Sequence, residues 1–254
     1  MNLLKQTTIA IIALTFFMTG CKSPQKEETF VAKAEKAHQK EAFNSQEAIQ
    51  FDFKLFFGGK ERMDATLTLL TNSSKGLIEF RNGAKIIYDH DKVFYSPDVP
   101  SEKSVRFDAY TWSYFFLFPY KMSDGGTIWS PYNNPATNKE QYETQKLTFA
   151  SGTGDAPEDW YVVYTNQETH LVEQLAYIVT ANASKTEAEK EPHGIQYKNF
   201  QTVNGIPFAT EWQFCGWSEE KEFGENIGNA SLTNIKFITV EADTFTPGKD
   251  FKTI

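Results

Sequence analysis

The spacing of apolar residues changes once along the chain, shortly before residue 49. From Thr29 to Phe43 the sequence is rich in Ala, Lys and Glu, and Phe30, Ala34 and Ala37 recur at helical spacing. From Ile49 onward, apolar and polar residues alternate in short runs, as is typical of strands with one buried face. The pattern therefore predicts one helix over residues 29–43, followed by a long series of strands.

The predicted strands follow one another at hairpin spacing. Turn residues separate them, and Asn82-Gly83 is the strongest hairpin signal because both positions accept a positive φ. About eleven strands favour an antiparallel meander, which must curl or close because a large open sheet leaves its edges exposed. The predicted strands cover residues 49–57, 63–69, 77–80, 85–88, 92–95, 144–149, 160–165, 171–180, 194–201, 208–217 and 230–240.

One segment departs from this alternation. Between Tyr110 and Phe118 only Thr111 and Ser113 are polar, and Pro119 follows. A core strand and a buried helix are the two alternatives, and the absence of strict alternation favours a helix that is apolar nearly all round. On the surface such a helix would expose a large apolar area, so we predict that it lies on the concave side of the curved sheet.

Aromatic residues make up 15% of the chain, with 22 Phe, 11 Tyr and 5 Trp. Most of them fall on apolar faces of the predicted elements, which agrees either with a packed aromatic core or with a ring-lined cavity for an acyl chain. The sequence leaves both interpretations open. The candidate ligand-binding residues are Trp112, Phe115, Phe116, Trp212 and Phe214.

The N-terminus has the features of a secretory signal. Lys5 precedes the apolar run Ile9–Met18, which is too short for a membrane span of about 20 residues. The run leads into Met18-Thr19-Gly20-Cys21, which resembles the lipobox of bacterial lipoproteins. The alternatives are an ordinary signal peptide with an incidental cysteine, or a buried N-terminal helix. We predict a signal peptide at 1–20, lipidation at Cys21, a lipidated tether at 21–28 and a single β domain at 29–254.

Charge and reactive residues exclude several functions. The chain has 25 Lys and Arg against 33 Asp and Glu, a net charge of −8 that disfavours nucleic-acid binding. The four His show no metal-ligand spacing, and the remaining thiol, Cys215, lies in an aromatic stretch typical of a buried residue. Acidic residues near Asp89 and Asp155 leave a weak calcium site as an alternative to solvated loops. We predict no catalytic residue, metal site or cofactor, and the oligomeric state is not predicted.

A resemblance to known proteins covers most of residues 29–240 and rests on the motifs Phe118-Pro119-Tyr120, Trp160–Tyr164, Asn204–Pro207 and Glu211-Trp212. With the lipobox, they resemble a family of flavobacterial lipoproteins, which is itself similar to the LolA/LolB lipoprotein-carrier superfamily. The resemblance implies an unclosed antiparallel β-barrel (a LolA-like half-barrel) with an internal aromatic plug helix and a hydrophobic cavity for acyl chains. No catalytic residue carries over, because that superfamily binds rather than catalyses.

These patterns together predict a non-catalytic lipoprotein of the outer membrane, anchored by its lipid, with a lipid or other apolar ligand as its partner. The anchor is expected on the periplasmic face or on the cell surface. The cell surface is one of the two alternatives because residues 25–28 resemble the export signal of Bacteroidota surface lipoproteins. The alternative is a surface interaction or structural lipoprotein whose barrel is packed and holds no ligand. The exposed apolar loop residue of LolB has no clear counterpart here, so receptor activity is not predicted.

Overall fold

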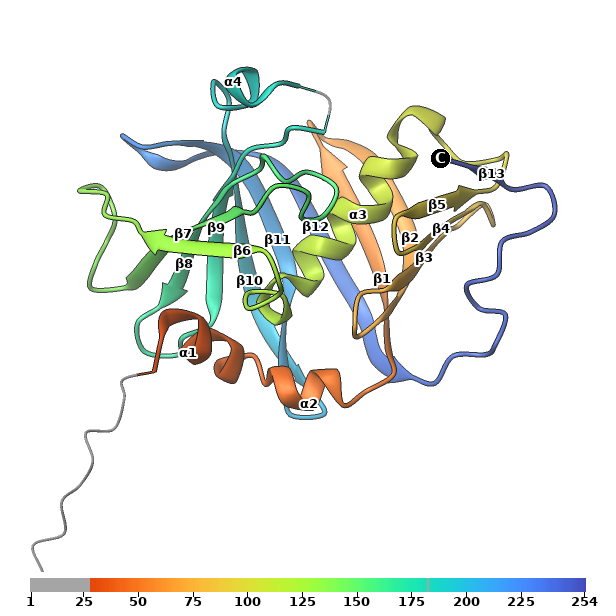
Figure 1. Ribbon diagram of the computed structural model, residues 1–254, viewed down its shortest axis with the longest axis horizontal. Coiled ribbons are helices and arrows are strands. Elements are labelled where there is room, and N and C mark those ends of the chain that lie inside the picture. The colour runs from red at the N-terminus through yellow and green to blue at the C-terminus, as the bar shows by residue number, and fades with distance from the viewer. Residues whose placement is uncertain (1–27, 182) are drawn as a thin grey trace, which may run out of the picture.

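One antiparallel sheet of 13 strands organises the protein (Figure 1). The computed structural model describes residues 28–181 and 183–254, so the predicted signal peptide, Cys21 and most of the tether lie outside the described residues. The strands are β1 (Ala48–Phe57), β2 (Lys60–Leu70), β3 (Lys75–Phe80), β4 (Lys85–Asp89), β5 (Lys92–Tyr95), β6 (Thr127–Pro131), β7 (Tyr142–Phe149), β8 (Tyr161–Asn166), β9 (Val172–Tyr177), β10 (His193–Val203), β11 (Ile206–Ser218), β12 (Glu222–Ile238) and β13 (Lys252–Thr253).

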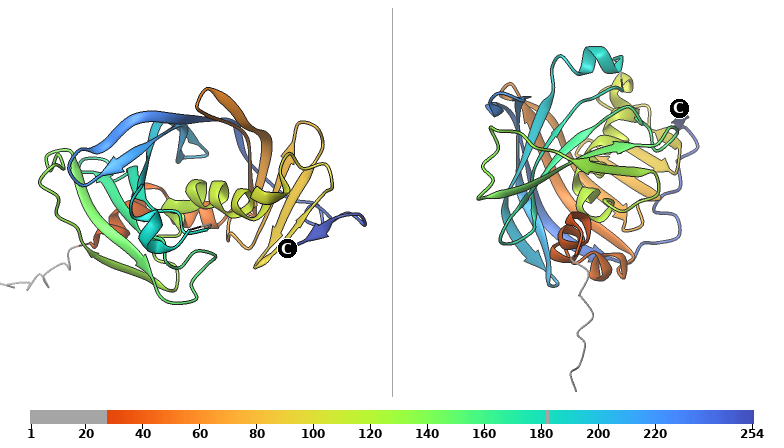
Figure 2. Two further views of the ribbon diagram at one scale, coloured as in Figure 1. Left: turned by 90° about the horizontal axis from the view of Figure 1, so that it is seen from above. Right: turned by 60° about the vertical axis from the view of Figure 1, so that its left-hand side comes forward.

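The sheet is a meander that curls without closing. Its strand order is β13-β5-β4-β3-β2-β1-β12-β11-β10-β9-β8-β7-β6, so β13 and β6 form its two edges. Only two neighbouring pairs are not consecutive in the sequence, β12 with β1 and β13 with β5. Seen from above, the strands bend around a central helix (Figure 2). This arrangement confirms the predicted unclosed antiparallel β-barrel.

The central helix is α3 (Val105–Leu117), flanked by single 3-10 turns over Glu102–Ser104 and Phe118–Tyr120. It lies on the concave side of the sheet, as predicted for residues 110–118, and begins five residues earlier than Tyr110. Pro119 falls within the 3-10 turn that ends it. The internal aromatic plug helix is therefore confirmed. A short helix, α4 (Lys185–Ala188), lies between β9 and β10.

The predicted helix over residues 29–43 is two helices, α1 (Phe30–Ala37) and α2 (Lys40–Asn44). Gln39 between them has a φ of 56°, which ends the first helix. On one continuous helix Phe43 would lie about 220° around the axis from Phe30. The break lets both rings point inward, and Phe43 stacks on Tyr120 with ring centroids 3.7 Å apart. The two helices cover one end of the barrel (Figure 1).

Three strands differ most from the predicted set, because their residues do not alternate between apolar and polar. β6 and β13 were not predicted, since β6 is a short edge strand that ends in Pro131 and β13 has two residues. β12 begins at Glu222, well before the predicted residue 230. Its first half contains Gly228, where an added Cβ would lie 2.4 Å from the ring of Phe57. Close approach of the neighbouring strand thus requires glycine where a strand pattern would place a side chain.

Candidate functional site: a cavity along the central helix

Helix α3 has two sides with different surroundings. The sheet-facing side presents Trp112 and Phe116 to the central strands. Phe116 stacks on Phe51 with centroids 4.2 Å apart, and Trp112 lies 5.9 Å from Phe53. The residual space near Phe116 is about 20 Å³, roughly the size of one water molecule. This side of the helix is therefore filled by aromatic side chains.

The predicted ligand-binding rings all belong to one buried cluster on the concave face. Trp112 lies 6.0 Å from Phe214, and Trp212 lies 5.4 Å from Phe53. Of the five predicted rings, only that of Phe115 lines a cavity of about 620 Å³ that borders the other side of the helix. The structure thus brings the five together in the core, and ligand binding by any of them stays a prediction.

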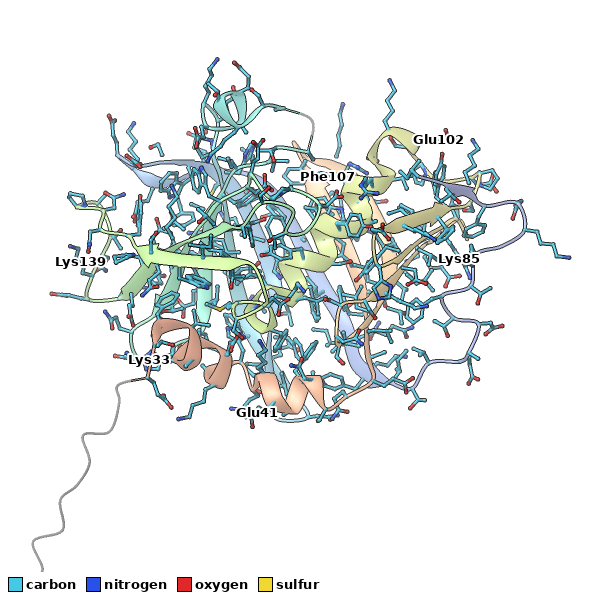
Figure 3. The ribbon with its side chains drawn as sticks, viewed as in Figure 1. Lys33, Glu41, Lys85, Glu102, Phe107 and Lys139 are labelled. Atoms are coloured by element: carbon cyan, nitrogen blue, oxygen red, sulfur yellow. The ribbon has the colours of Figure 1, made fainter. Side chains whose placement is uncertain are left out.

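The opposite side of α3, which we call the open side, borders a cavity of about 620 Å³. Arg106, Tyr110, Tyr114 and Leu117 line it from the helix, at intervals of three or four residues that place them on one face. Phe107, near the start of the helix, also lines it (Figure 3). The volume falls within the range of about 300–1,000 Å³ that is usual for small-molecule sites.

The far wall of this cavity comes from both arms of the curled sheet. Tyr88 belongs to β4, whereas Phe149, Tyr161 and Tyr177 belong to β7, β8 and β9. The loop over residues 152–156 completes the rim. The cavity is therefore bordered by both arms of the sheet, which curls without closing (Figure 2). From Arg106 to Leu117 the helix rises about 16 Å, and residues along this whole length line the cavity.

Tyrosines form much of the inner wall. Tyr161 and Tyr177 are paired across β8 and β9, and their rings stack with centroids 6.1 Å apart. Tyr114 approaches from α3, with its ring centroid 5.6 Å from that of Tyr161. Burial raises the pKa of all three phenols, so they are neutral hydroxyl groups at physiological pH.

One end of the cavity is bounded by Arg106. Its Nε donates to Asp155 Oδ1 at 2.9 Å, its Nη1 donates to the Asp91 carbonyl oxygen at 3.3 Å, and its guanidinium lies 5.2 Å from the Tyr110 ring centre. Hydrogen bonding to Asp155 raises the pKa of Arg106. Arg106 therefore connects α3 to the turn after β4 and to the loop that follows β7.

The other end is bounded by Lys121, whose Nζ donates to Asp124 Oδ2 at 2.6 Å and to Ser73 Oγ at 2.8 Å. Between the two ends, Asp159 accepts from the Thr180 backbone N–H at 2.8 Å, and burial raises the pKa of its carboxyl. Counting Asp91, Asp124, Asp155 and Asp159 against Arg106 and Lys121, the cavity rim has more acidic than basic groups.

A separate contact fixes the helix to the sheet. The carboxylate of Asp108 is 3% exposed and accepts from Arg62 Nη2 at 3.0 Å. Its Oδ1 also accepts from Trp112 Nε1 at 3.0 Å. Because Arg62 belongs to β2, this contact holds the sheet-facing side of α3 against the strands.

Candidate chemistry elsewhere is sparse. In residues 28–181 and 183–254, no group of three or more His, Cys, Asp or Glu is arranged to hold a metal ion. Near the two acidic loops, Asp89 pairs with Lys75 at 2.8 Å and Asp155 pairs with Arg106. Cys215 is buried and its Sγ lies 3.7 Å from the Gly194 carbonyl oxygen, as expected for a core thiol. Within the described residues, no helix is long and apolar enough to cross a membrane.

The same architecture occurs in solved structures. A LolA superfamily protein from Nitrosomonas europaea superposes with a TM-score of 0.55 at 11% identity, covering 84% of this chain and 97% of that one. The protein has a LolA-like fold. A domain from Vibrio parahaemolyticus, assigned to outer membrane lipoprotein-sorting proteins, superposes with a TM-score of 0.52 at 10% identity, covering 84% and 95%. No protein-family model and no curated protein matches the sequence.

The resemblance to the LolA superfamily is thus confirmed for the fold. Sequence identities of 10% and 11% show a shared fold alone. Sequence reasoning missed the open side of α3. The available signal was the series Arg106, Tyr110 and Tyr114, in which side chains with apolar bodies and polar tips recur at helical spacing. The lack of alternation over residues 110–118 predicts a helix that is apolar nearly all round, and this prediction does not reveal the polar tips on its open side.

Proposed function

We propose that the protein is a lipid-anchored, non-catalytic binding protein of the bacterial outer membrane, and that it holds an apolar or acylated ligand in the cavity along α3. One observation carries the proposal. A cavity of about 620 Å³ borders one side of a helix whose other side is filled by aromatic rings. The LolA superfamily and lipoprotein-sorting structures that share the fold support a ligand of this class.

The shape and lining of the cavity favour a chain-like ligand. Each CH₂ group transferred from water to an apolar site contributes about 0.8 kcal/mol. Ten such groups along the open side of α3 would contribute about 8 kcal/mol before the cost of association is subtracted. An acyl chain of ordinary length could therefore bind without any charged contact.

The position of the N-terminus suggests how the cavity is oriented on the membrane. The tether from Cys21 to Glu28 spans at most about 25 Å, which keeps α1 close to the lipid surface. The turn at Ser123 contacts this end of the barrel, because its backbone N–H donates to Glu35 Oε1 at 2.9 Å and its Oγ accepts from Lys40 Nζ at 2.9 Å. The Lys121 end of the cavity is therefore the end nearer the membrane.

Lipid anchoring is tested at Cys21. Replacing Cys21 with Ser should abolish incorporation of labelled palmitate and release the protein from the membrane fraction. Labelled acyl chains that persist in the Cys21→Ser variant would contradict lipidation at this residue. Protease treatment of intact cells then distinguishes the cell surface from the periplasmic face.

Ligand binding is tested on the chain from residue 22 onward, which keeps every described helix and strand. Native mass spectrometry followed by solvent extraction should show lipid at about one molecule per protein. A ligand-free mass after gentle purification, with no lipid taken up on incubation, would contradict the proposal. That result would favour an interaction or structural lipoprotein, an alternative consistent with the filled sheet-facing side.

A further inference from the structure

Three hydroxyl groups in the cavity wall have no partner among the described residues. They belong to Tyr114, Tyr161 and Tyr177, which all line the cavity. By contrast, Tyr110 in the same wall donates to the His90 carbonyl oxygen at 3.0 Å. Tyr197, just behind the wall, donates to the Phe115 carbonyl oxygen at 2.9 Å. The hydroxyls of Tyr114, Tyr161 and Tyr177 therefore differ from those of Tyr110 and Tyr197, which are already engaged.

Tyr161 and Tyr177 are deeply placed, Tyr114 is half-buried beside them, and the three residues lie close together. Tyr161 and Tyr177 are each 94% buried, since only 6% of either residue is exposed. The ring centroid of Tyr161 lies 5.6 Å from that of Tyr114 and 6.1 Å from that of Tyr177. We call this group the tyrosine cluster.

A bare hydrocarbon would leave the tyrosine cluster without hydrogen bonds. Buried tyrosine hydroxyls usually find a partner, and an unmade hydrogen bond in an apolar site is costly. The ligand that suits the cluster therefore carries acceptor oxygens within its apolar body. A carboxylate fits poorly, because the rim already holds more acidic groups than basic ones and both Arg106 and Lys121 are paired with aspartates. A neutral carbonyl group has the required acceptor oxygen and no charge.

We propose that the hydroxyl of Tyr161, together with that of Tyr114 or Tyr177, donates a hydrogen bond to the carbonyl oxygen of an acyl ester, so that the cavity prefers acyl esters to chains that lack a carbonyl group. This inference rests on the proposed function, because it names the chemical class that the same cavity selects. It concerns specificity, whereas the apolar walls account for retention of the chain itself.

A matched pair of lipids tests the inference. 1-Palmitoylglycerol and 1-O-hexadecylglycerol have the same head group and chain length, and they differ in the carbonyl group. The chain from residue 22 onward is incubated with an equimolar mixture, and the bound lipids are extracted and quantified. The unmodified protein should enrich the ester about three- to tenfold, the effect of about one net hydrogen bond.

Tyrosine-to-phenylalanine variants identify the groups responsible. The triple variant Tyr114→Phe, Tyr161→Phe and Tyr177→Phe should bind both lipids equally, with total bound lipid maintained. The control Tyr142→Phe removes a tyrosine hydroxyl that lies outside the cavity and is already hydrogen-bonded, and it should keep the ester preference. Because the triple variant could be poorly folded, the single variant Tyr161→Phe is measured too and should show a reduced preference.

The measurements separate failure of the role given to the tyrosine cluster from failure of the proposed function. Equal binding of the two lipids by the unmodified protein, or an undiminished ester preference in both Tyr161→Phe and the triple variant, would overturn the role of the tyrosine cluster while leaving the binding function intact. Retention of neither lipid by the unmodified protein would overturn the proposed function and this inference together.

Discussion

The two sides of α3 show how one helix can serve as both core and binding surface. On the sheet-facing side, Trp112 and Phe116 meet rings from the central strands and leave almost no space. On the open side, Tyr110 and Tyr114 face the two separated arms of the sheet and border about 620 Å³ of space. The difference comes from the sheet, because the central strands lie behind the helix while its arms do not meet in front of it.

Two arginines form ion pairs at α3, one on each side of the helix, and the two pairs differ in their exposure to solvent. Arg62 reaches Asp108 on the sheet-facing side, where the carboxylate is 3% exposed. Arg106 reaches Asp155 at the cavity rim, where both side chains are a third or more exposed. An exposed ion pair contributes little to stability, whereas leaving a buried charge without its partner is costly. The first pair therefore fixes the helix and the second closes one end of the cavity.

The largest expected effect is on the filled side. Trp112→Ala should lower the free energy of unfolding by about 3–5 kcal/mol, because the surrounding rings cannot fill the space left. Tyr110→Ala, its counterpart on the open side, should cost only about 1–2 kcal/mol. Urea unfolding monitored by circular dichroism measures both. Equal losses for the two variants would mean that the two sides of the helix are not packed differently.

Smaller losses of stability are expected when the two arginines are replaced. Arg62→Ala should cost about 3 kcal/mol because it leaves the Asp108 carboxylate buried without its charged partner. Arg106→Ala should cost about 1 kcal/mol or less, and it should speed the release of bound lipid by opening one end of the cavity. Thermal unfolding and stopped-flow lipid release give the two quantities. A stability loss for Arg106→Ala as large as that for Arg62→Ala would contradict the assignment.

A histidine provides a test based on pH. His38 is buried at the end of the barrel covered by α1, and its Nε2 accepts from the Val172 N–H at 3.0 Å. Burial lowers its pKa from 6.5 to about 3. Below pH 6.5 the unfolded chain therefore binds a proton that the folded protein does not, and stability falls as the pH falls.

The expected contribution of His38 is a loss of about 1.4 kcal/mol per pH unit on acidification from pH 6.5 toward pH 4. The variant His38→Gln keeps a hydrogen-bond acceptor and does not titrate. Its stability should therefore vary less with pH over this interval. An unchanged slope, measured by urea unfolding at each pH, would show that His38 is protonated in the folded state.

Much of the fold followed from residue spacing, and the cavity did not. Alternation along residues 49–57 and 63–69 predicts β1 and β2 because each strand has one buried face. Phe115 and Phe116 show the limit of this reasoning. They are adjacent and equally apolar, yet only Phe115 lines the large cavity. Whether a ring meets another ring or open space depends on the curvature of the sheet, which alternation does not record.

The central claim is that the space along the open side of α3 holds the ligand, and filling that space tests it most directly. Thr111 lines the cavity, whereas Ile128 on β6 is 50% exposed and lies outside it. The lipid bound per protein is measured by native mass spectrometry for the unmodified chain, Thr111→Trp and Ile128→Trp. We predict about one lipid per protein for the unmodified chain and Ile128→Trp, and loss of most of that lipid in Thr111→Trp with folding preserved. Equal lipid in both variants, or none in the unmodified chain, would contradict the account.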